Sequence, residues 1–122
     1  MIYFKGANVV HVGDLFFNGI YPFIDAGSGG SLEGVIAGVD DVLGRIDDNT
    51  KVIPGHGPLA NKRDLHDFHT MLKATSSVVR TMAEEGKSLE QIQAAGLGSK
   101  WDSWTKGFLS EKVWISIIYS SL

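Results

Sequence analysis

The chain has 122 residues, a length that suits one compact domain built around one core. Its formal net charge is −3 and no cluster of Lys and Arg is present in the sequence, which argues against a nucleic-acid or anionic-membrane partner. The sequence contains no cysteine, so disulfides and thiolate metal sites are excluded, and any bound metal ion must be held by imidazole and carboxylate groups.

The first half of the chain has strand patterns followed by a helix pattern and another strand. Apolar and β-branched residues predict strands over 2–5, 8–13 and 15–18, separated by short breaks that contain glycine. A glycine-rich loop then leads to a helix over about 32–46 with one apolar face. The strand at 51–53 follows this helix, and we expect it to lie parallel to a strand that precedes the helix.

From Asn61 onward the pattern is helical. Asn61 can cap a long helix that ends at Gly86, and Ser88 with Gln91 three residues later has the pattern of a capping box for a short helix. The segment that begins at Ser110 is apolar and β-branched, so both helix and strand stay open for it.

These patterns describe one domain with two regions. We expect residues 1–60 to form a β-rich part, and residues 61–122 to form a helical C-terminal region of the same domain. The predicted class is α/β, an α+β half-sandwich with a mixed sheet, helices packed on one face and a helical tail. The sequence shows no basic-then-apolar leader and no run of 18 apolar residues, so we expect a soluble, cytoplasmic chain without a membrane span.

Two polar residues directly follow short apolar stretches. Asp14 closes the run 8–14, and His56 lies between two glycines in the run 54–58. We expect each at the point where a strand runs into a loop, because a rigid sheet can hold a side chain there while the loop leaves it open to solvent. If the carboxylate and the imidazole converge, they can bind a metal ion. The alternatives are a turn-forming Asp14 and a loop histidine held by its two glycines.

The same residues carry a family resemblance. Four motifs occur in order: Gly13-Asp14-Leu15-Phe16-Phe17, Tyr21-Pro22-Phe23-Ile24-Asp25, Gly29-Gly30-Ser31 and Pro54-Gly55-His56-Gly57. Together they resemble the C-terminal half of a metallo-β-lactamase-fold metallohydrolase, over roughly residues 3–73. Such enzymes bind one or two zinc ions between two similar halves. The resemblance implies that Asp14 bridges two metal ions and that His56 is a terminal ligand of one of them.

Most of the family's metal ligands have no counterpart in this sequence. The family's His-X-His-X-Asp-His motif and a further His belong upstream of the strand that carries Asp14, and none of His11, His56, His66 and His69 falls into a His-X-His pattern. A catalytic zinc ion normally needs three protein ligands and a water. We therefore predict a truncated half-domain that is not catalytic alone and keeps weak zinc binding at Asp14 and His56. The alternative is a zinc-dependent hydrolase that is active only as a homodimer or with a separately encoded N-terminal half.

The remaining histidines and the aromatic residues have structural interpretations. His11 is expected to be a strand histidine, and the helical pair His66 and His69 a solvated helix surface. The tail is expected to pack onto the sheet through Trp101, Trp104 and Trp114. A half-fold should also expose an apolar patch, unless the tail covers it, and such a patch favours a two-fold homodimer. The patch is expected to consist of Val10, Val12, Phe16, Phe17, Phe23 and Ile24.

Overall fold

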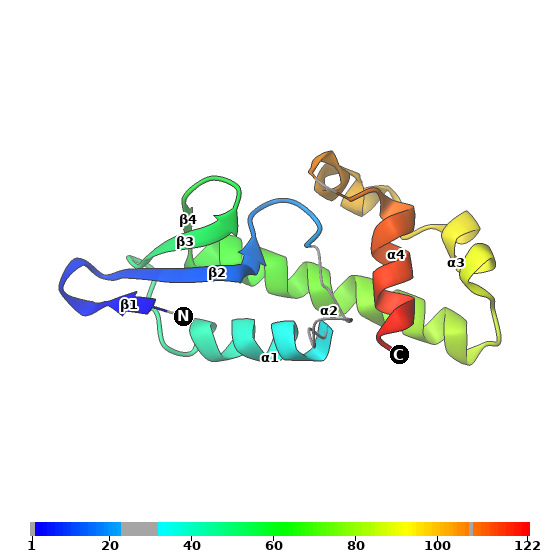
Figure 1. The fold of residues 1–122 in the computed structure, drawn as a ribbon, viewed down its shortest axis with the longest axis horizontal. Coiled ribbons are helices and arrows are strands. Elements are labelled where there is room, and N and C mark those ends of the chain that lie inside the picture. The colour runs from blue at the N-terminus through cyan, green and yellow to red at the C-terminus, as the bar shows by residue number, and fades with distance from the viewer. Residues whose placement is uncertain (1, 23–31, 108) are drawn as a thin grey trace.

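The computed structural model describes residues 2–22, 32–107 and 109–122. The long helix α2 (Lys62–Glu84) runs along the molecule, with the strands near one end and the C-terminal helices near the other (Figure 1). The elements follow one another along the chain as β1 (Ile2–Phe4), η1 (Lys5–Ala7), β2 (Val9–Phe17), α1 (Leu32–Leu43), β3 (Lys51–His56), β4 (Ala60–Asn61), α2, α3 (Leu89–Ala95), the 3-10 helix η3 (Ser99–Lys106) and α4 (Glu111–Ser120).

The described strands form one mixed sheet in the order β1-β2-β3-β4. The central pair β2 and β3 is parallel, and both outer pairs are antiparallel. Parallel strands need a crossover connection, which α1 supplies between β2 and β3. The sequence prediction of an α/β fold with a parallel strand–helix–strand unit is confirmed at this level.

A bulge in β2 replaces the break that the sequence suggested. We predicted two strands, 8–13 and 15–18, but the chain forms one strand from Val9 to Phe17. Gly13 pairs with Pro54 and Phe17 pairs with His56, so four steps along β2 lie opposite two steps along β3. Gly13 has φ 57°, a left-handed conformation that glycine adopts readily and that occurs in one type of β-bulge. The Gly-Asp pair therefore marks extra residues within a strand, and the prediction that Asp14 stands at a strand end is wrong.

The sheet has one covered face and one open face. Val10, Val12 and Val52 are buried on the side where α1 and α2 pack, with the buried side chains of Val39 and Leu65. The opposite face has no comparable cover among the described elements, because His11 is exposed between the two buried valines. The register and the burial pattern place six residues on this open sheet face: Ile2, Phe4, Val9, His11, Lys51 and Ile53.

The apolar patch predicted from sequence is largely inside the core. Val10, Val12, Phe16 and Phe17 are at most 4% exposed, because the helices cover them. The other two members of that patch, Phe23 and Ile24, lie outside the described residues. Among the strand residues whose side chains are described, the exposed large apolar ones are instead Ile2 and Phe4, at 59% and 51%.

The caps of the helical region follow the sequence prediction. The Asn61 side chain accepts from the backbone N–H of Asp64 at 2.9 Å, and the Asp64 carboxylate accepts from the N–H of Asn61 at 3.2 Å. Ser88 and Gln91 form the capping box that was predicted for the short helix. Ser110 caps α4, so the segment left open between helix and strand is a helix.

The tail docks mainly on α2. The ring of Trp114 stacks on Tyr21 with centroids 5.4 Å apart, and its indole N–H donates to the Thr75 hydroxyl at 3.1 Å. The ring of Trp104 lies 6.4 Å from that of Phe68 on α2. These contacts correct the expectation that the tryptophans pack against the sheet, because α2 extends beyond the strands and offers the tail its own apolar surface. Within the described ranges, no helix is long and apolar enough to cross a bilayer.

Candidate functional site

His56 lies at the junction of strand and loop, as the sequence predicted, although β3 runs to His56 and so extends beyond the predicted range of 51–53. The loop that follows is bonded to the end of β2. The backbone N–H of Asn18 donates to the His56 carbonyl at 2.9 Å, and the Asn18 side-chain amide donates to the Pro58 carbonyl at 3.0 Å. The His56 ring packs against Phe17, with centroids 4.7 Å apart and an angle of 30° between the planes. The histidine is exposed, so the sheet presents an oriented imidazole to solvent.

Gly57 has a structural reason to be glycine. Its φ of 99° lies in the region that side chains disfavour, and a Cβ atom there would stand 2.8 Å from the carbonyl oxygen of Asn18. The turn after His56 thus needs close backbone contact with the end of β2. The glycine in this motif is explained by that contact whether or not the histidine binds a metal ion.

Asp14 and His56 are carried by neighbouring parallel strands. Asp14 lies between the Gly13–Pro54 pair and the Phe17–His56 pair, in the part of β2 where the ladder is irregular. Bulges of this kind can turn a side chain away from the regular alternation of a strand. The backbone of Asp14 and the backbone of His56 therefore lie toward the same end of the β2–β3 pair. The side chain of Asp14 lies outside the described part of the structure.

The described side chains do not make a catalytic zinc site. Such a site uses three protein ligands and leaves one position for water. Among the residues whose side chains are described, no group of three or more His, Asp or Glu could hold a metal ion. With Asp14 added by resemblance, His56 would share a metal ion with one carboxylate, which fits weak binding better than catalysis.

The other predicted histidines divide into two kinds. His11 is exposed on the open sheet face, and His66 is exposed on α2. His69, which we also placed on the solvated surface, is largely covered, with 13% of its side chain exposed. The prediction was wrong for His69 because α1 packs over the edge of the apolar stripe of α2 where this residue lies.

His69 lies in a groove between α1 and α2 that sequence reasoning missed. Burial lowers the pKa of its imidazole, the carboxylate of Asp40 opposes that shift, and Lys73 and His66 add to it. The Nε2 atom of His69 is 3.9 Å from an Asp40 carboxylate oxygen. In the sequence, His69 lies at the edge of the apolar face of α2. Such a position can be exposed or buried, and the packing of α1 decides which.

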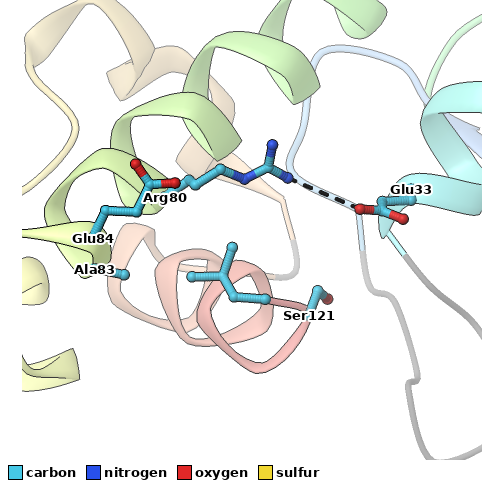
Figure 2. Close-up of a pocket in the computed structure, with 6 residues that line it drawn as sticks. Glu33, Arg80, Ala83, Glu84 and Ser121 are labelled. Atoms are coloured by element: carbon cyan, nitrogen blue, oxygen red, sulfur yellow. Dashed lines mark ion pairs between the residues drawn. The ribbon is translucent and has the colours of Figure 1, made fainter.

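The same groove continues toward the end of α2. Figure 2 shows Arg80 of α2 reaching toward Glu33 of α1, with 4.0 Å between the guanidinium and the carboxylate. A pocket of about 360 Å³ lies there, lined also by Ala83, Glu84 and Ser121. Both partners of the ion pair are more than half exposed, so its contribution to stability is small. This groove has charges of both signs that already face one another.

A scan against protein-family models finds no match for the chain, and a search of curated proteins finds none either. The resemblance therefore rests on the sequence motifs alone.

Proposed function

We propose that the chain is the C-terminal half-domain of a metallo-β-lactamase-fold metallohydrolase, that it is not catalytic alone, and that it retains weak zinc binding at Asp14 and His56. The observation that carries this proposal is the position of His56. It stands at the end of a parallel strand, beside the strand that bears Asp14, with its loop held by Asn18. Open α/β sheets bind their ligands outside the carboxyl ends of parallel strands, which is where this histidine is found.

The open sheet face supports the half-domain part of the proposal. Sheets made only of parallel strands are normally covered on both faces, whereas antiparallel pairs such as β1–β2 and β3–β4 can leave one face open to water. Here the helices cover one face, while Ile2, Phe4, Val9 and Ile53 give the other face apolar character. A second sheet layer packed on this face would complete a sandwich of the kind that the family uses.

Zinc titration tests the metal part of the proposal. Added Zn²⁺ is expected to raise the melting temperature, because a ligand that binds the native state stabilises it by mass action. His56→Ala should remove this shift, whereas His66→Ala, which changes an exposed histidine on α2, should keep it. A shift that survives in His56→Ala would place the metal ion elsewhere and contradict the assignment.

Hydrolysis assays test the claim that the chain alone is not catalytic. With two ligands the site lacks the set that lowers the pKa of a metal-bound water, so we expect no zinc-dependent turnover of a β-lactam or a thioester. Zinc-dependent turnover that is lost in Asp14→Ala would show instead that the chain is a working hydrolase.

The alternative is that the site is completed by a second copy or by a separately encoded N-terminal half. The open sheet face favours this alternative, since it is the surface on which such a partner would pack. In a homodimer, zinc-dependent turnover per chain should rise with protein concentration as the dimer forms. Activity that does not depend on concentration would exclude the homodimer version.

A further inference from the structure

A pocket of about 380 Å³ lies between α2 and η3, and two tryptophans line it. Trp101 and Trp104 come from η3, Asp67 and Thr70 come from α2, and Lys100 completes the lining. In a 3-10 helix, residues three apart lie on the same side. Trp101 and Trp104 therefore lie on the same side of η3, which faces Asp67 and Thr70 of α2 across the pocket.

The backbone beneath the two tryptophans is braced by the segment after β2. The Tyr21 N–H donates to the Trp104 carbonyl at 3.0 Å, and the buried Tyr21 hydroxyl donates to the Trp101 carbonyl at 3.5 Å. At Gly107, directly after η3, an added Cβ atom would come within 2.7 Å of the Ile20 side chain. Both tryptophan carbonyls thus accept a hydrogen bond from one tyrosine, so the backbone that carries the two rings is preorganised.

The chemistry of the pocket suits a cation. The ammonium of Lys100 already lies 5.0 Å from the centre of the Trp101 ring, a cation–π arrangement. Across the described ranges no ion pair joins Lys100 to Asp67, so the ring, and not the carboxylate, holds the lysine. Asp67 adds a negative charge to the lining of the pocket.

We propose that this pocket, the Trp101–Trp104 pocket, binds a small organic cation with a quaternary ammonium group, which displaces Lys100 from the Trp101 ring. Aromatic faces recognise quaternary ammonium ions by cation–π attraction. The lysine ammonium is compact and strongly hydrated. A quaternary ammonium has no N–H group to keep solvated, so it gives up less hydration than the lysine ammonium when it enters a space lined by two indoles.

The test is a titration of the full chain, labelled with ¹⁵N, with choline chloride. The indole N–H signals of the three tryptophans report the site, since Trp114 is fully buried and hydrogen-bonded to Thr75 and serves as the internal control. We expect the Trp101 and Trp104 signals to move and the Trp114 signal to stay. Potassium chloride at equal ionic strength and 3,3-dimethyl-1-butanol, the uncharged analogue of choline, should move none of them. Equal shifts with the uncharged analogue would overturn the proposal.

Three variants locate the binding. Trp104→Ala should weaken choline binding roughly three- to thirtyfold, the range expected for loss of one aromatic face. Asp67→Asn should weaken it severalfold, while Asp48→Asn, a matched change in an exposed turn, should not. Lys100→Met should strengthen it, because the competing ammonium is removed. Equal or weaker binding by Lys100→Met, or no movement of the Trp101 and Trp104 signals in either the parent chain or this variant, would contradict the proposal.

Phosphocholine distinguishes a free cation from a lipid headgroup. Its phosphate adds negative charge beside Asp67, so we expect it to bind more weakly than choline. Tighter binding of phosphocholine would assign the pocket to a phospholipid headgroup and overturn its assignment to a free cation.

Discussion

At Gly57 a single hydrogen in place of a side chain allows the strand that ends at His56 to turn against Asn18. Gly57→Ala would place a methyl group 2.8 Å from the Asn18 carbonyl oxygen at a φ of 99°. We expect the free energy of unfolding to fall by about 1–3 kcal/mol, the usual cost of overpacking. Gly6→Ala, at a glycine with open space around its Cβ direction, should change it by less than about 0.5 kcal/mol. Chemical denaturation of both variants checks this, and equal losses would contradict it.

His69 gives the folded state a pH dependence. Because burial holds its pKa below the ordinary 6.5, the folded protein binds fewer protons than the unfolded chain once the pH falls toward that value. Stability should therefore decrease as the pH drops through 6.5 to the lowered pKa, and the loss should level off below it. Denaturation from pH 7.5 to 5 should show this decrease in the parent chain and a weaker one in His69→Gln.

His66→Gln is the matched control for His69, since His66 lies one turn away on α2 but is exposed. His66 is the smallest of the causes that lower the pKa of His69, so its removal should weaken the pH dependence only slightly, and by less than His69→Gln does. If both variants flatten the profile equally, the decrease comes from some other group, and the assignment to His69 fails.

The position and burial of a single residue could be predicted where its neighbours in space are also its neighbours in the sequence. The position of His56 followed from the short apolar run and the glycines around it, because a strand end and its turn are local features. The burial of His69 depends on α1, which is distant in sequence, so the pattern of α2 alone could not reveal it. The sequence predicts a break in the strand at Gly13, but a left-handed glycine fits a loop and a bulge equally well.

The elements themselves were the most predictable level. The cap at Asn61 and the capping box of Ser88 and Gln91 were both predicted, since a cap is a contact between residues three apart. The return bond that Asp64 accepts, which makes the Asn61 cap a full capping box, was not predicted. The strands around residue 14 were less predictable, because continuation of β2 through its bulge depends on pairing with β3. The helical nature of α4 was also undecided, since its β-branched residues fit a strand until α2 and Trp114 give it a core to pack on.

The cap of α2 should contribute measurably to stability. Asn61→Ala removes the acceptor for the Asp64 N–H and should lower the free energy of unfolding by about 1 kcal/mol. Asn61→Ser keeps a capping oxygen and should retain most of that stability. Thermal and denaturant unfolding of the two variants will separate them. Equal stability of Ala and Ser at this position would mean that the cap contributes nothing.

For the whole molecule, the class of fold could be predicted from the sequence, but the face of the sheet that the helices leave uncovered could not. The strand pattern showed apolar residues and could not say which ones the helices would cover. The structure buries Val10 and Val12 and exposes Ile2 and Phe4. The open sheet face, and not the patch predicted from sequence, is therefore the surface that supports the half-domain part of the proposal. An isologous dimer is the simplest closed arrangement that would cover it, because one patch packs against its own copy.

Sedimentation velocity at micromolar concentration tests this account most directly, with two variants beside the parent chain. We predict a dimer for the parent chain and a monomer for Phe4→Glu, which puts a charge on the open sheet face where the side chain is 51% exposed. Val113→Glu, at a comparably exposed residue of α4 (45%), should remain dimeric. A monomeric parent chain that matches Phe4→Glu in both sedimentation and apolar-dye binding would contradict the account, because the open sheet face would then have no need of a second half.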